Sequence, residues 1–165
     1  MSRGLGDVYK RQLAARLKAV SADHLLHISD TGIKRLARSG TIATLLPLTA
    51  FSLNEPYAPG RRMIDAGCAV ALASDLNPGS CFSSSIPLLF ALACIQMKLT
   101  PEEALTALTI NGAAALGREK KVGSIDVGKK ADLVLLKFPS YKFLPYHIGM
   151  NIVDTVIKDG VLYIV

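Results

Sequence analysis

The sequence predicts an α/β protein, with part of a parallel β/α barrel followed by a small module of β-strands. Three candidate strand ends are separated by helical segments, and their spacing of about 23 to 28 residues is typical of successive βα units. Residues 68–73 are apolar without a break, as expected for a strand buried on both faces of a parallel sheet. Strand patterns return at residues 131–136 and 155–163, and the second contains an Asp-Gly hairpin turn.

In the first half of the chain, strands are expected to alternate with helices. We expect a strand end at residues 19–22, a helix at 29–40, a strand at 41–46, a helix at 61–66 and a strand at 68–73. Ser29 can cap the first helix and Gly40 can end it. Pro47 stops the second strand, because proline cannot donate a hydrogen bond to a neighbouring strand.

The middle of the chain is predicted to be helical. Ser83 or Ser84 can cap an apolar helix that runs to Met97. Residues 100–103 read Thr-Pro-Glu-Glu, which supplies the cap, the first-turn proline and the glutamate of a capping box. Asn111 can start a further short helix.

Composition excludes several classes of protein. The chain has 165 residues, too few for a whole barrel, which needs about 250. The net charge of +6 comes partly from clusters at 118–121 and 129–130 in polar turns without aromatic residues, so we expect no nucleic-acid partner. The longest apolar stretch, 86–97, is shorter than the about 20 residues of a membrane span. No secretory signal is visible, and the three widely spaced cysteines suit reduced, buried thiols, so we expect a cytoplasmic protein.

Asp75 and His24 are the residues best placed for chemistry. Each follows a predicted strand, and the carboxyl ends of parallel barrel strands share one rim, so the two side chains could form one site. Imidazole and carboxylate both bind divalent metals, which lower the pKa of bound water. Two alternatives stay open: Asp75 could cap the following turn, and His24 could be bonded to its neighbours. His27 aligns with nothing else.

The turn after Asp75 offers polar groups that could grip an anionic substrate. Asn77, Gly79 and Ser80 supply an amide, a flexible backbone N–H and a hydroxyl, although an ordinary Pro-Gly turn has the same composition. His147 lies in a later loop, where it could be a site residue or surface. Two ligands do not complete a catalytic metal site, which normally has at least three from the protein.

Several segments together resemble the amidohydrolase superfamily. Residues 123–134, Gly-Ser-Ile-Asp-Val-Gly-Lys-Lys-Ala-Asp-Leu-Val, are similar to the segment where such chains leave the barrel for a β module. Closer cues resemble the imidazolonepropionase family and lie at residues 20–25, 75–80, 99–104 and 145–147, with Asn151 shortly after. The resemblance extends over about residues 12 to 165.

The resemblance implies a cytoplasmic, metal-dependent hydrolase of histidine degradation that uses zinc or iron. Its reaction opens the cyclic amide of 4-imidazolone-5-propanoate to N-formimidoyl-L-glutamate. By the same resemblance, Asp75 corresponds to the barrel's last metal ligand, which also takes a proton from the metal-bound water and passes it to the leaving nitrogen. His24 corresponds to the catalytic histidine beside the metal, and Asn77, Gly79 and Ser80 to the substrate-contacting turn.

The resemblance also fixes what the chain lacks. The family's HxH pair, a further metal histidine and an acidic catalytic residue have no counterpart here, and we expect them upstream. Residues 1–11 then form a leader that is not native to the domain, residues 12–120 the last three βα units with C-terminal helices, and residues 121–165 strands of a small β-sandwich module. We expect the full-length protein to act on a small molecule and to form a homodimer, and the isolated chain to be inactive. Alternatives are another amidohydrolase, such as a cyclic-imide hydrolase or a deaminase, or an inactive fragment with a structural role.

Overall fold

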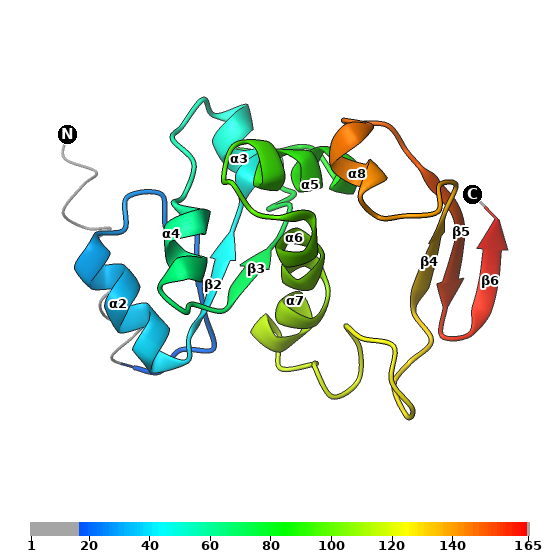
Figure 1. The fold of residues 1–165 in the computed structure, drawn as a ribbon, viewed down its shortest axis with the longest axis horizontal. Coiled ribbons are helices and arrows are strands. Elements are labelled where there is room, and N and C mark those ends of the chain that lie inside the picture. The colour runs from blue at the N-terminus through cyan, green and yellow to red at the C-terminus, as the bar shows by residue number, and fades with distance from the viewer. Residues whose placement is uncertain (1–16, 165) are drawn as a thin grey trace.

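The structure, a computed structural model, describes residues 17–164 and contains two separate three-stranded sheets (Figure 1). One sheet is parallel, with strand order β1-β2-β3, and the other is antiparallel, with order β4-β5-β6. The predicted leader at residues 1–11 lies outside the described residues. Within the described part of the chain, no helix is long and apolar enough to cross a membrane.

The parallel sheet confirms the three predicted strands. It consists of β1 (Ser21–Asp23), β2 (Ile42–Leu45) and β3 (Val70–Leu72). Ala22 pairs with Ala43, and Thr44 with Ala71, so the strands run side by side in sequence order. All three residues of β3 are buried, which agrees with its uninterrupted apolar sequence.

Helices α2 (Asp30–Ser39) and α4 (Gly60–Asp65) connect these strands, as predicted. The Ser29 hydroxyl caps α2 by accepting a hydrogen bond from the Gly32 N–H at 3.1 Å, and Gly40 ends it with φ 74°.

A third helix, α3 (Pro47–Ser52), was not predicted. Pro47 does end the strand, but it also stands at the first position of a helix, where its missing N–H has no intrahelical partner to lose. The sequence therefore continues from β2 into α3 after only one residue, Leu46.

Three further helices follow the parallel sheet: α5 (Ile86–Ile95), α6 (Pro101–Leu108) and α7 (Ile110–Ala115). The cap of α5 is Ser85, so the prediction of Ser83 or Ser84 is wrong by one or two residues. Asn111 does not start α7, which has Thr109 at its N-cap. Instead the Asn111 amide donates to the Val70 carbonyl at 2.8 Å and so binds α7 to β3.

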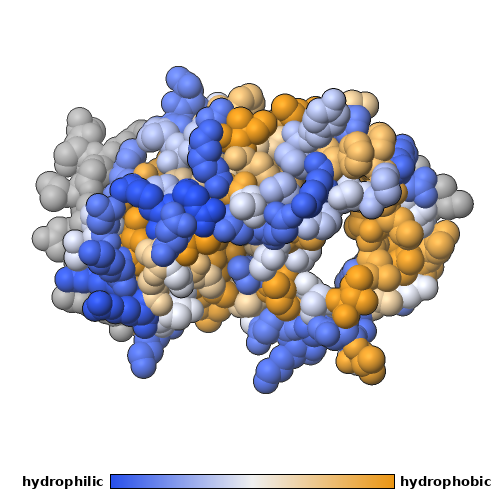
Figure 2. All heavy atoms as spheres, in the orientation of Figure 1, coloured by the Kyte–Doolittle hydropathy of each residue, from blue (hydrophilic) through white to orange (hydrophobic). Residues whose placement is uncertain are grey.

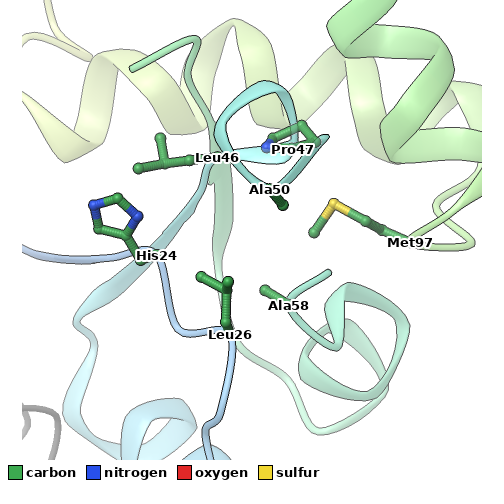
Figure 3. Close-up of a pocket in the computed structure, with 7 residues that line it drawn as sticks. All are labelled: His24, Leu26, Leu46, Pro47, Ala50, Ala58 and Met97. Atoms are coloured by element: carbon green, nitrogen blue, oxygen red, sulfur yellow. The ribbon is translucent and has the colours of Figure 1, made fainter. Parts of the chain in front are cut away.

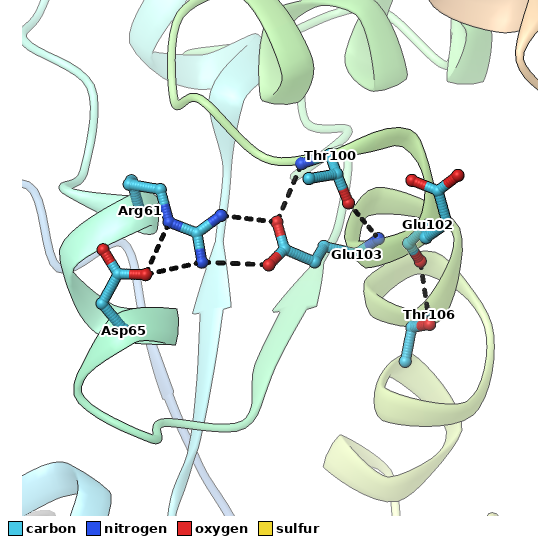
Figure 4. A network of polar contacts seen from close by, with 6 residues as sticks. All are labelled: Arg61, Asp65, Thr100, Glu102, Glu103 and Thr106. Carbon is cyan, nitrogen blue, oxygen red and sulfur yellow. Dashed lines mark hydrogen bonds and ion pairs between the residues drawn. The ribbon is translucent and has the colours of Figure 1, made fainter.

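The capping box of α6 is confirmed and extends into an ion pair with α4. The Thr100 hydroxyl accepts from the Glu103 N–H at 3.2 Å, and the Glu103 carboxylate accepts from the Thr100 N–H at 2.8 Å. Arg61 donates to both Glu103 oxygens, at 2.7 and 2.9 Å, and also pairs with Asp65 (Figure 4). The two helices are thus joined by a bidentate contact, the strongest geometry of such pairs.

The core lies between the parallel sheet and the helices that follow it. Its fully buried side chains include Leu25, Leu45, Met63, Leu89 and Phe90. Helix α6 packs on β3, α7 packs on β2 and β3, and α5 contacts α3. These contacts fix the strands and therefore the residues at their ends.

The antiparallel sheet contains β4 (Leu133–Leu136), β5 (Val153–Lys158) and β6 (Val161–Ile164), with the short helix α8 (Phe143–Tyr146) before β5. The hairpin turns on Asp159 (φ 49°) and Gly160 (φ 82°), as predicted for an Asp-Gly turn. Apolar side chains on this sheet gather at one end of the molecule (Figure 2), and five of them are exposed: Val134, Leu135, Val161, Leu162 and Tyr163.

Candidate functional site

The carboxyl ends of the three parallel strands form a rim at one edge of the sheet. His24 follows β1 directly, Leu46 and Pro47 follow β2, and Asp75 stands three residues after β3. Because β2 lies between the other two strands, His24 and Asp75 flank the residues that follow β2. The structure thus places both predicted catalytic residues on the same rim.

His24 occupies a strained turn. Its backbone φ is 68°, and the Leu25 N–H donates to the Asp23 carbonyl at 3.0 Å across it, which makes a three-residue γ-turn with a positive central φ. Such turns are rare and strained, and strained backbone is concentrated at functional sites. The next residue, Leu25, also has a positive φ of 60° and is fully buried, so the core holds this turn in place.

The imidazole of His24 stands at the edge of an apolar niche (Figure 3). The niche leaves no room for a water molecule. His24 itself is exposed, and no described residue hydrogen-bonds its ring. The niche is lined by His24, Leu26, Leu46, Pro47, Ala50, Ala58 and Met97.

Asp75 is partly buried and is held by a contact that the sequence did not predict. Its Oδ2 accepts a hydrogen bond from the Thr49 hydroxyl at 2.8 Å, and its Oδ1 has no hydrogen-bond partner among the described residues. Its φ of 54° is in the left-handed region, which Asp tolerates better than most residues. Within the described chain the carboxylate bonds no backbone N–H of the following turn, so the capping alternative for Asp75 is not observed.

Asn77 caps that turn instead. Its Oδ1 accepts from the N–H groups of Gly79 and Ser80, both at 2.9 Å, and its Nδ2 donates to the Asp75 carbonyl at 2.7 Å. The Ser80 hydroxyl also bonds the Asn77 side chain. The three predicted substrate-binding residues therefore lie together beside Asp75, with their polar atoms bonded to one another.

The other two histidines do not join this group. His147 stacks on Phe138 and Phe143, with ring centroids 4.5 and 5.6 Å away, in the segment around α8. His27 is exposed. Among residues 17–164, no three His, Cys, Asp or Glu side chains are grouped closely enough to hold a metal ion.

Thr49 is the site residue that sequence analysis missed. It lies in the first turn of α3, is 5% exposed, and contacts a carboxylate 26 residues later in the chain. The only local signal was Pro47, which fits the start of a helix as well as the end of a strand.

The residues on the rim fit part of a metal site. A carboxylate with one oxygen bonded to a neighbouring hydroxyl and the other free has the arrangement of a metal-ligating aspartate, because such ligands are normally oriented by a second hydrogen bond. The imidazole of His24 would be a compatible neighbour, because imidazole is a common metal ligand and proton carrier. The described residues thus contribute one oriented carboxylate to a set of metal ligands.

Comparison with known proteins shows which proteins the whole chain is similar to. Two curated relatives named imidazolonepropionase are 82% identical over 152 residues in Parabacteroides distasonis and 70% identical over 152 residues in Bacteroides fragilis. Each match covers 92% of this chain and 36% of the relative, so the chain spans about a third of the length of these relatives.

A solved structure supports a barrel-type hydrolase fold. The chain is similar to an adenosine deaminase from Xanthomonas campestris with bound zinc, with a TM-score of 0.82 and 25% identity, over 93% of this chain and 40% of that one. The sequence model of the amidohydrolase family matches residues 6–163 of this chain. This match includes the parallel sheet, every residue on the rim and the antiparallel sheet up to Tyr163, and the chain belongs to the amidohydrolase family.

Proposed function

We propose that this chain is the C-terminal part of an imidazolonepropionase. The full-length protein would add water to the cyclic amide of 4-imidazolone-5-propanoate and release N-formimidoyl-L-glutamate. The observation that carries the chemistry is Asp75, an oriented carboxylate with one free oxygen at the end of a parallel strand. The choice of substrate is supported by 82% identity to an imidazolonepropionase.

The proposed cofactor is a divalent metal, zinc or iron, with its remaining ligands supplied by the rest of the protein. When bound, such a metal lowers the pKa of coordinated water to near neutrality. Asp75 would hold it through the free Oδ1, in agreement with the hydrogen bond that occupies Oδ2.

In the proposed reaction, Asp75 carries the proton. Water attacks the ring carbonyl carbon and gives a proton to Asp75, and Asp75 returns that proton to the ring nitrogen as the C–N bond breaks. His24, exposed on the same rim, stabilises the negative charge that develops on the carbonyl oxygen. The turn of Asn77, Gly79 and Ser80 contacts the substrate, and its internal hydrogen bonds reduce the entropy that binding would cost.

The remaining parts of the chain have proposed places in the parent protein. Residues 12–120 would complete the barrel, and residues 121–165, with the sheet β4-β5-β6, would belong to a small β-sandwich module. The exposed apolar residues of that sheet suit a partner layer. We propose a cytoplasmic protein that pairs with a second copy and acts on a small molecule.

A deaminase of ring amines is the second candidate. It is favoured by the TM-score of 0.82 to the zinc-bound adenosine deaminase, but the identity to that protein is only 25%. The identity of 82% to an imidazolonepropionase makes ring opening the stronger proposal.

The test is ring opening by the full-length protein. We expect metal-stripped protein to be inactive and protein reloaded with zinc or iron to convert 4-imidazolone-5-propanoate to a product heavier by one water, detected by mass spectrometry. Adenosine, assayed in parallel, should release no ammonia. The 165-residue chain alone should be inactive in both assays. Failure of the reloaded full-length protein to open the ring would refute the proposal.

A further inference from the structure

The hydroxyl of Thr49 makes an unusual contact for a helical threonine. In helices this group commonly donates to the carbonyl four residues earlier, as Thr106 and Thr109 do here with Glu102 and Leu105. Thr49 lies in the first turn of α3, so the residue four earlier, Leu45, belongs to β2 and not to the helix, and its carbonyl accepts from the Ala73 N–H. The Thr49 hydroxyl instead donates to Asp75.

The position of Thr49 is fixed by the packing of α3. Leu48 and Ala50, on either side of it, are 1% and 3% exposed, and α3 contacts α5. Thr49 is itself 5% exposed, so water competes little for its hydroxyl. The same helix borders the niche beside His24 through Pro47 and Ala50. Helix α3 therefore stands between the two candidate catalytic residues and contacts the surroundings of both.

We infer that Thr49 is a positioning residue that holds the Asp75 carboxylate with Oδ2 occupied and leaves Oδ1 free to bind a metal. This inference rests on the proposed function. A carboxylate can otherwise rotate about its side-chain bonds, and its two oxygens are equivalent as ligands. A buried hydroxyl 2.8 Å from Oδ2 removes that freedom before the metal binds.

The test compares variants of Thr49 in the full-length protein by their metal affinity, measured by competition with a chelator. Thr49→Val has nearly the same shape and lacks the hydroxyl, and we expect it to bind zinc about 10- to 100-fold more weakly. Thr49→Ser keeps the hydroxyl and should restore most of the affinity. At saturating zinc, Thr49→Val should lower kcat and leave KM nearly unchanged.

Thr41→Val is the matched control. Thr41 is 2% exposed, and its hydroxyl has no hydrogen-bond partner among the described residues. The same substitution at a buried threonine should therefore leave zinc affinity unchanged. If Thr49→Val does not fold, Thr49→Ala compared with Thr49→Ser isolates the hydroxyl in the same way.

The outcomes separate this inference from the proposed function. Wild-type zinc affinity in Thr49→Val, with wild-type protein that binds zinc and opens the imidazolone ring, overturns the positioning role alone. Weakened affinity in Thr49→Val, with wild-type protein that binds zinc but does not open the ring, supports the positioning role and overturns the substrate. Wild-type protein that binds no zinc or iron overturns both.

Discussion

His24, Leu25 and Asp75 have backbone conformations that few residues with a side chain adopt. Their φ angles are 68°, 60° and 54°, in the left-handed region that disfavours residues with a side chain. Leu25 is buried and anchors the turn, whereas His24 is exposed, so the packing of Leu25 compensates for the strain at its neighbour. Strained backbone of this kind is concentrated at functional sites. Among the described residues, His24 and Leu25 are the one adjacent pair of non-glycine residues with positive φ.

Replacing His24 by glycine should stabilise the fold while it removes the imidazole. Glycine adopts positive φ without steric cost, which favours the folded state. Glycine also raises the entropy of the unfolded chain, which offsets part of this gain. We therefore expect His24→Gly to raise the free energy of unfolding by about 0.5–1 kcal/mol. Urea denaturation measures this change. The same variant should lose ring-opening activity in the full-length protein.

Asn54→Gly is the control for this substitution. Asn54 is also exposed and has a φ of 52°, but no γ-turn hydrogen bond spans it, because the Glu55 N–H donates to the Ala50 carbonyl, so its replacement should change stability by less than about 0.5 kcal/mol. A loss of stability in His24→Gly would show that the imidazole makes a stabilising contact and that the strain argument is wrong.

At single residues, the sequence predicts well where the partner is near in the chain. Ser29, Thr100 and the Asp159-Gly160 turn follow local rules, and each has the predicted role. Thr49 was missed because its partner is 26 residues away, and no local pattern records such a contact. The roles of His24 and Asp75 in catalysis stay predictions.

Among the elements, the junction of α4 and α6 carries the strongest described ion pair. Arg61 binds Glu103 with its two terminal nitrogens, and both side chains are only partly buried, at 33% and 27% exposed. The Arg61 guanidinium beside Glu103 holds the pKa of that carboxyl below its usual value of 4.5. Because Glu103 also completes the capping box of α6, one side chain serves both purposes.

Glu103→Ala should therefore lower the free energy of unfolding by about 1–2 kcal/mol at neutral pH, through loss of the cap and of the Arg61 contact. The folded carboxyl has a depressed pKa, so its contribution is complete above about pH 5 and is lost as the pH falls through the folded value. The difference between wild-type and Glu103→Ala in urea denaturation should shrink between pH 7 and pH 3.

Glu102→Ala is the matched control. Glu102 is the neighbouring acid in the same helical turn and pairs with Lys142 on the surface, so its loss should cost less than that of Glu103. Equal costs for the two variants would contradict a special role for the Arg61 contact.

Helix α3 shows the limit of prediction for elements. Its six residues are too few for a helical period to be recognised, and Pro47 is compatible with both a strand end and a helix start. The longer helices α2 and α6 have a cap, a periodic pattern or both, and the prediction found them. The missed helix is the one that carries Thr49.

At the scale of the molecule, the parallel and antiparallel sheets were both predicted, and each has the predicted strand direction. The contacts between elements that lie far apart in the chain could not be predicted from the sequence. Contact between α5 and α8 depends on segments about 50 residues apart, beyond any local pattern. The rim similarly depends on the three strands being in sequence order, because another order would separate His24, Thr49 and Asp75.

The role of Asp75 as a metal ligand is tested most directly by the metal content of the full-length protein with and without the Asp75 carboxylate. Asp75→Asn keeps the size and the tolerance of positive φ but lacks the charge, and Asp30→Asn is the control, because Asp30 is exposed and pairs only with Arg62 in the described chain. We predict that wild-type and Asp30→Asn retain stoichiometric zinc or iron after dialysis and that Asp75→Asn loses it. Retention of the wild-type metal content by Asp75→Asn would contradict the assignment of Asp75 as a metal ligand.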